Sequence, residues 1–205
     1  MKRRQILIAS VLASGLGAVA LWQWARFPPD TTPPGAYMRI ARAIADDAPE
    51  NAFAYLEEEA QHACFTIAGY GREAVAVIDE SYPEPDKSEA LARYRPYAAP
   101  DGPTLFARFV RDRGFGARLR RDLSGIAETE IAGERATIVT VHGTRYAFRL
   151  RPNGIWGLTM FTAELLAEQD KLARDLPLIE RAAQDYRRGG AETPVSPKPA
   201  GSLAP

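Results

Sequence analysis

A long uncharged stretch near the N-terminus constrains this chain more than any other feature. Residues 5–25 carry no charge, and the basic residues 2–4 come directly before them. As a helix this stretch is roughly 32 Å long, about the thickness of the hydrocarbon core of a bilayer. Trp22 and Trp24 stand at its end, where aromatic side chains prefer the membrane interface. The pattern predicts a membrane anchor over residues 1–26, with the N-terminus inside and the rest of the chain outside.

This orientation predicts a single-pass protein of the bacterial inner membrane with its folded domain on the periplasmic side. A cleaved signal peptide is the alternative. Residues 6–17 would then form its apolar core, and residues 18–20, Ala-Val-Ala, would be the cleavage site. Cleavage near Ala20 would release a secreted protein. The length of the uncharged stretch and its tryptophan pair favour the retained anchor.

Proline and glycine divide the rest of the chain into a folded part and two flanks. Four prolines between residues 27 and 35 predict a stiff extended spacer. Residues 189–205 are rich in Gly, Pro, Ala and Ser and predict a disordered tail. Hydrophobic residues make up 46% of the chain and charged residues 25%, which are the proportions of an average globular protein. We therefore expect a single domain over residues 36–188.

The charge balance and the cysteine count exclude several classes of protein. Lys plus Arg and Asp plus Glu number 26 each, so the basic excess of a nucleic-acid-binding protein is missing. Cys64 is the only cysteine, which excludes an intramolecular disulfide and a zinc site built on Cys-x-x-Cys. In an exported domain we expect Cys64 to be buried and unreactive.

The first half of the domain has the apolar periodicity of helices. Asp47 and Glu50 have the spacing of a capping box, which predicts that one long helix starts there and runs up to Pro83. Gly69 and Gly71 are expected to bend this helix. A shorter helix is expected over residues 89–97, and another ends at Gly114. The residues expected on buried helix faces are Tyr37, Ile40, Ile44, Phe53, Leu56, Ala60, Cys64, Ile67, Val75, Ile78, Leu105, Phe106, Phe109 and Val110.

In the second half the apolar period changes from 3.6 to 2, which indicates strands. Strands are predicted over residues 126–131 and 135–141, and Asn153-Gly154 is a strong hairpin signal. A last helix starts near Thr162, and Pro177 should kink or split it. The alternating residues of the third and fourth strands are Tyr146, Phe148 and Leu150, then Trp156, Leu158 and Met160. The fold class is therefore α+β: a helical first half, a three- to four-stranded antiparallel meander whose apolar face the helices cover, and a long C-terminal helix.

Motifs for catalysis or for cofactor binding are missing from the sequence. It contains no Walker loop, no Gly-x-Gly-x-x-Gly after a strand, no Gly-x-Ser-x-Gly and no His-Glu-x-x-His. Glu59 and His62 form one Glu-x-x-His step, which is half of a di-iron site, but the second half is missing. His142 lies in a predicted turn without a partner that the sequence identifies. We expect no metal, no cofactor and no assigned catalytic residue, and an enzyme is the less favoured class.

Arginine is the one local charge feature. Six arginines lie within a short segment that Asp112 alone opposes: Arg108, Arg111, Arg113, Arg118, Arg120 and Arg121. A dense guanidinium cluster can bind carboxylates or phosphates, so it predicts contact with an anionic surface or an acidic partner. Ion pairs with the acidic residues of neighbouring helices are the alternative.

The strand and turn pattern carries a family resemblance. Its residues are Gly133, Ala136, Ile138 and Thr140, then Gly143, Tyr146 and Phe148, then Asn153, Gly154, Trp156 and Leu158. The pattern resembles the β-meander of exported domains of the nuclear-transport-factor-like and cystatin-like kind, and uncharacterised envelope proteins of high-GC bacteria. The resemblance implies a cavity between sheet and helices. Tyr146, Phe148 and Trp156 would line such a pocket, and the favoured alternative is that they form plain core. This chain departs from that family in ending on a long helix, and it offers no position for the family's Asp–His pairs.

Three functions remain open on this basis. The leading hypothesis is a membrane-tethered envelope domain without enzymatic activity, which contacts another envelope protein or an anionic surface. The second is a small-molecule-binding domain with a pocket between sheet and helices. The third is a hydrolase-type enzyme whose site is assembled only in three dimensions.

Overall fold

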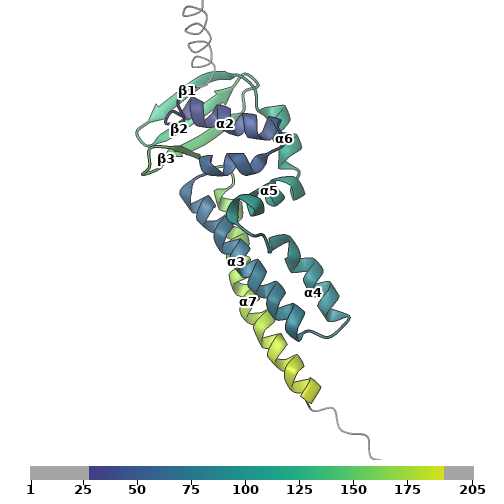
Figure 1. Ribbon diagram of the computed structural model, residues 1–205. Coiled ribbons are helices and arrows are strands. Elements are labelled where there is room, and N and C mark those ends of the chain that lie inside the picture. Colours follow the sequence, from purple (N-terminus) through teal and green to yellow (C-terminus); the bar gives the residue numbers. More distant parts are fainter. Residues whose placement is uncertain (1–27, 192–205) are drawn as a thin grey trace, which may run out of the picture.

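A four-stranded sheet and several short helices pack together at one end of the molecule, and a pair of long helices extends away from them (Figure 1). The computed structural model describes residues 28–191, so the predicted membrane segment at residues 5–25 lies outside them. The elements are α2 (Pro33–Ala45), η1 (Pro49–Tyr55), α3 (Glu58–Ser81), α4 (Asp86–Tyr94), η2 (Arg95–Tyr97), α5 (Gly102–Asp112), α6 (Phe115–Asp122), β1 (Ile126–Ala132), β2 (Arg135–Thr140), β3 (Arg145–Leu150), β4 (Trp156–Leu158) and α7 (Thr162–Ala191).

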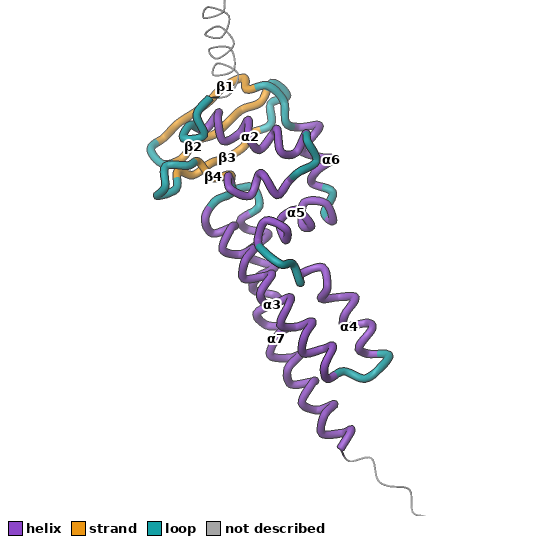
Figure 2. Tube along the Cα trace, viewed as in Figure 1, coloured by secondary structure: helices purple, strands orange, loops and turns teal. Residues whose placement is uncertain are grey.

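Two parts of the molecule are distinguished below. The head consists of the sheet with α2, η1, α5 and α6, and the stalk consists of α3, α4 and α7 (Figure 2). Helices α3 and α7 lie side by side along the stalk, and α4 packs on α3. Within residues 28–191, no helix combines the length and the apolar character that a membrane span requires.

The sheet is an antiparallel meander in the order β1-β2-β3-β4, as the sequence predicted. Ala136, Ile138 and Thr140 of β2 are buried on the inner face, which packs on the helices. Tyr146 and Phe148 of β3 lie on the same face. The α+β class, the helical first half, the meander and the long C-terminal helix are therefore confirmed.

The prediction of one long helix through residues 47–82 is wrong at its N-terminal end. The chain forms η1, leaves the helix at Leu56, which has an extended backbone (ψ 158°), and starts α3 at Glu58. Leu56 makes a parallel bridge to Leu158 of β4, and the Glu57 amide donates to the Leu158 carbonyl at 3.1 Å. This break joins the helical half to the edge of the sheet.

The predicted capping box does not form either. Asp47 has a positive φ of 55°, and the residue that precedes η1 is Ala48, which makes no side-chain cap bond. The actual side-chain cap in this region is Thr32, whose Oγ1 accepts a hydrogen bond from the Gly35 amide at 3.2 Å. Helix α2 therefore begins at Pro33, inside the predicted spacer, because proline needs no hydrogen-bond acceptor in a first turn.

The two long helices are less interrupted than the sequence predicted. Gly69 and Gly71 lie inside α3, which continues through both. Pro177 lies inside α7, which is a single helix rather than two. Helix α7 also continues to Ala191, so it takes in the first residues of the predicted tail at 189–205, and the rest of that tail lies outside the described residues.

Candidate functional site

The interface between sheet and helices is a filled core rather than a chamber. Tyr146, Phe148 and Trp156, the predicted pocket lining, are all buried in the hydrophobic core. The Tyr146 ring packs on Tyr37 of α2 with ring centroids 5.8 Å apart. Burial raises the pKa of Tyr37 to about 12, although a hydrogen bond with the Ser124 backbone works in the opposite direction. These three residues therefore pack the core, and none of them lines the pockets of this region.

The six arginines of the predicted anion site do not form one free cationic surface. Each of four pairs with a carboxylate and a fifth caps a backbone carbonyl: Arg111 with Glu50 (3.6 Å), Arg113 with Glu164 and Glu168, Arg118 with Asp122 (3.6 Å), Arg120 with Asp47 (3.2 Å), and Arg108 with the Ala98 carbonyl (3.4 Å). Among residues 28–191 only Arg121 of the six has no such contact. Two of these arginines pair with neighbouring helices, as the alternative interpretation predicted: Arg111 with η1 and Arg113 with α7. Arg118 pairs within α6, and Arg120 pairs with a loop residue.

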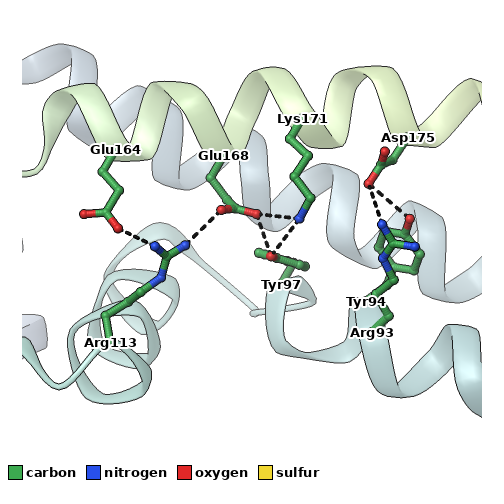
Figure 3. Close-up of polar contacts among 8 residues, drawn as sticks. All are labelled: Arg93, Tyr94, Tyr97, Arg113, Glu164, Glu168, Lys171 and Asp175. Atoms are coloured by element: carbon green, nitrogen blue, oxygen red, sulfur yellow. Dashed lines mark hydrogen bonds and ion pairs between the residues drawn. The ribbon is translucent and has the colours of Figure 1, made fainter.

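A row of polar residues along α7 makes hydrogen bonds and ion pairs with residues of the neighbouring segments (Figure 3). Glu168 accepts a hydrogen bond from the Tyr97 hydroxyl at 2.5 Å and pairs with Lys171 and Arg113 at 3.0 Å each. Its side chain is only 12% exposed. Burial acts to raise the pKa of Glu168, but the bonds from Tyr97 and Lys171 and the nearby positive charges outweigh it and lower the pKa.

About two turns after Glu168 on α7, Asp175 repeats this arrangement on a smaller scale. It accepts a hydrogen bond from the Tyr94 hydroxyl at 3.1 Å and lies 4.0 Å from the Arg93 guanidinium. Burial, helped by the Asp175 charge, raises the pKa of Tyr94. In both groups donors from η2, from α4 or from Arg113 at the end of α5 bind a carboxylate of α7, and for Glu168 they keep the pKa low. A general acid or base needs a pKa near the working pH, so this row fits the joining of helices rather than proton transfer.

A second buried carboxylate lies where η1, α3, β3 and α7 meet. Glu57 is 5% exposed, accepts a hydrogen bond from Thr162 Oγ1 at 2.8 Å and lies 2.7 Å from the Arg149 guanidinium. A β-carbon on Gly157 would come within 2.7 Å of the Glu57 Cα, so glycine is required at that point of β4. Glu58 and Glu59, which follow it, are exposed, and nothing local in the sequence distinguishes Glu57 from them.

The histidines and the cysteine offer no chemistry in the part of the chain that the structure describes. His62 and His142 are both exposed, and residues 28–191 contain no cluster of three potential metal ligands. Cys64 is fully buried, as predicted, and burial raises the pKa of its thiol to about 12. A thiol with this pKa is almost entirely protonated at neutral pH and is therefore a poor nucleophile.

The surface of the head contains an apolar hollow of about 500 Å³ beside the start of β1. Its walls come from α2 and from the segment that joins α6 to β1. The lining residues are Tyr37, Met38, Ala41, Arg42, Ala45, Arg120, Leu123, Ser124, Gly125 and Ile126. Within the described chain the buried Ser124 Oγ has no hydrogen-bond partner, so the wall of the hollow holds one unsatisfied polar atom.

The same side of the head ends in an open sheet edge. Strand β1 is the terminal strand of the sheet, and no described residue pairs with its outer edge. The register predicts which groups face that edge, because pairs in an antiparallel ladder alternate between bonded and unbonded. Counted from the two-residue turn at 133–134, Thr129 and Ile131 direct their N–H and C=O groups away from β2. The bond from the Val141 amide to the Gly125 carbonyl, 2.8 Å, agrees with this alternation.

Several side chains of β1 are also exposed at this edge. Ile131 lies on the inner face, opposite the buried Ala136, but is 60% exposed because the helical layer does not reach it. A bulge at Ala127 shifts the register, which places Glu128 and Glu130 on the outer face beside Val139 and Thr137. The two glutamates thus alternate with Thr129 and Ile131 along a strand whose outer hydrogen bonds are unmade.

Comparison of the chain with protein-family models, with curated proteins and with solved structures gives no match. The candidate site therefore rests on the geometry of the head alone.

The sequence analysis missed both the hollow and the open edge. It predicted the strand over residues 126–131, but not that this strand would be terminal in the sheet, because strand order is a long-range property. The alternation of Glu128 and Glu130 with Thr129 and Ile131 was visible in the sequence and is the signal that could have found the edge. The hollow has no such signal, since its lining comes from two segments that lie far apart in the sequence.

Proposed function

We propose that this protein is a membrane-tethered envelope domain that binds another protein through the head. The observation that carries the proposal is the apolar hollow of about 500 Å³ that lies directly beside the open edge of β1. Exposed apolar surface combined with unpaired strand groups is typical of sites that bind a partner.

The other surfaces of the molecule support this choice by elimination. The polar row on α7 and the group around Glu57 satisfy their own charges, so neither presents a cleft with free acid or base groups. The arginines are largely paired, which removes the main support for an anion site. The filled core removes the expected lining of a small-molecule pocket at Tyr146, Phe148 and Trp156.

The proposed tether places the head close to the bilayer. Residues 5–25 serve as the anchor in this proposal, and α2 of the head begins at Pro33. The intervening residues 26–32 can span at most roughly 25 Å when fully extended. A partner that reaches the hollow is therefore itself a membrane protein or a protein that works next to the inner membrane.

Photo-crosslinking in cells tests the proposal. A photoreactive phenylalanine derivative at Met38, on the hollow, should give a discrete crosslinked product, and the same probe at Leu178, exposed on the stalk, should not. Ala45→Arg adds a large charged side chain at the rim of the hollow and should abolish the product. Ala173→Arg on the exposed side of α7 is the matched control and should leave it intact. Equal crosslinking from Met38 and Leu178, insensitive to Ala45→Arg, would overturn the proposal.

A further inference from the structure

We infer that the partner binds by adding an extended strand, antiparallel to β1, in which basic and apolar residues alternate. This inference rests on the proposed function, because it names the kind of segment that the head would bind. It follows from three features of the open edge: the direction of its backbone groups, the residues on its two faces, and their charge.

The backbone supplies hydrogen bonds at regular spacing. Thr129 and Ile131 direct their N–H and C=O groups to the open edge, as the register shows. An antiparallel strand can bond both residues, so the contact extends the four-stranded sheet by one strand. The bulge at Ala127 interrupts the ladder, which limits continuous pairing to the part of β1 that follows it.

The inner face determines where the added strand needs apolar residues. Side chains of the added strand that point inward would lie beside Ile131, whose apolar surface is 60% exposed. Beyond the bulge, where continuous pairing ends, the bound segment would pass Ile126, which lines the hollow together with Met38 and Leu123. An apolar side chain at that position can fill the hollow. The inner face thus calls for apolar residues at every second position.

The outer face determines the charge of the added strand. Glu128 and Glu130 lie on this face at the open edge, and both side chains are exposed. Arg145 already pairs with Glu130 at 2.6 Å from the β3 side, whereas Glu128 makes no ion pair within residues 28–191. Basic residues opposite these positions give favourable cross-strand pairs, and acidic residues there give repulsion.

The same charges disfavour a second copy of this chain as the occupant. Antiparallel pairing of β1 with itself about Thr129 would place Glu128 of one copy opposite Glu130 of the other. Moving the register by one bonded pair, with Thr129 opposite Ile131, would place Glu130 opposite Glu130. Like charges directly opposite one another destabilise a sheet, so an extended segment of a different protein is the better fit.

Synthetic peptides test this mode of binding on the full-length chain. The probe is a seven-residue peptide that alternates valine with lysine. Two peptides of the same length serve as controls. One alternates valine with glutamate, and the other contains the same valines and lysines as the probe, with all valines in one block and all lysines in another. Hydrogen exchange should show protection of the 126–132 segment with the alternating basic peptide and with neither control. Equal protection by all three peptides, or by none, would overturn the inference.

Substitutions at the edge test the backbone contact itself. Thr129→Pro removes an amide that points to the open edge and leaves the bonds to β2 in place, whereas Thr129→Ala keeps the amide. Binding of the basic peptide should weaken about five- to tenfold in the proline variant and stay unchanged in the alanine variant. Peptides that are methylated on every second backbone nitrogen provide the same test without changing the protein. Methyl groups on the amides that point to β1 should abolish binding, and methyl groups on the other amides should leave it intact.

The outcomes separate this inference from the proposed function. The crosslink at Met38 could be abolished by Ala45→Arg and left unchanged by Thr129→Pro. This result would support protein binding by the head and would overturn strand addition. Loss of the crosslink in Ala45→Arg, together with loss of peptide binding in Thr129→Pro, supports both the proposed function and strand addition. A dimer of the full-length chain that Thr129→Pro dissociates would show that β1 pairs with itself, which overturns the assignment of a basic partner segment.

Discussion

Gly71 of α3 lies directly against the backbone of Tyr97 in η2: a β-carbon on Gly71 would be 2.4 Å from the Tyr97 carbonyl carbon. Gly71→Ala would therefore force η2 away from α3, and Tyr97 holds the bond to Glu168 on α7. We expect a loss of about 1–3 kcal/mol in the free energy of unfolding, the usual cost of overpacking. Chemical denaturation monitored by circular dichroism measures this loss.

Gly69 provides the matched control two residues earlier in the same helix. A β-carbon there meets no atom within 4 Å. Alanine is the better helix former, so Gly69→Ala should stabilise the protein by about 0.5–1 kcal/mol. An equal effect of the two substitutions, in either direction, would show that the approach of η2 to α3 is not what requires glycine at position 71.

These two glycines illustrate what sequence reasoning could and could not find. Periodicity placed both in one helix, because spacing of apolar residues is a local property. It assigned them the same role, a bend, because only the tertiary structure shows that Gly71 meets η2 and Gly69 meets open space. The break at Leu56 was missed for the same reason, since it depends on pairing with Leu158, far away in the sequence.

The candidate site was less predictable than the fold. The arginines stood out by their density, yet the acids that pair with them, such as Glu164 and Asp47, lie in distant segments. The alternation of β1 was visible, but its meaning depends on β1 being the terminal strand. Local patterns thus predicted the elements, and the properties that depend on neighbours had to come from the structure.

Glu168 should make the stability of the protein sensitive to acid. Its pKa is lower in the folded protein than the usual value of 4.5, so its ionised form stabilises the fold. This contribution is present above about pH 4.5 and is lost as the pH falls through the folded pKa. Replacing Glu168 with Gln should remove it. The stability difference between wild type and Glu168→Gln should therefore shrink as the pH is lowered from 6 to 3 in a series of denaturation experiments.

Tyr97→Phe probes the same group at neutral pH. The substitution removes the hydroxyl that donates to Glu168 at 2.5 Å and accepts from Lys171 at 3.4 Å. Hydrogen bonds to charged groups contribute about 1.5–3 kcal/mol, so a loss of this order is expected. In the Glu168→Gln background the effect of Tyr97→Phe should be smaller, and full additivity in this double-mutant cycle would contradict direct coupling of the two side chains.

Arg149 should matter more for stability than other exposed arginines. Arg149→Ala would leave the Glu57 carboxylate, 5% exposed, without the guanidinium that lies 2.7 Å away. An uncompensated buried charge is costly, and we expect a loss of about 1–3 kcal/mol. Arg145→Ala is the matched control on the same strand, because its partner Glu130 is exposed and such pairs contribute at most about 1 kcal/mol. Thermal unfolding of the two variants should rank them in this order, and the reverse order would assign Glu57 no special role.

The N-terminal segment should hold the protein in the membrane fraction. Deletion of residues 1–26 removes the uncharged stretch at 5–25 together with its basic flank. The remaining chain should lose its membrane association, because no helix within residues 28–191 has the length and apolar character to span a bilayer. Alkaline carbonate extraction distinguishes an inserted anchor from peripheral binding, and mass spectrometry of the mature chain identifies its first residue. A retained anchor predicts an intact N-terminus in the extracted membrane. A mature chain that begins just after Ala20 and fractionates with the soluble proteins would instead support the signal-peptide alternative, and the partner would then no longer need to lie near the membrane.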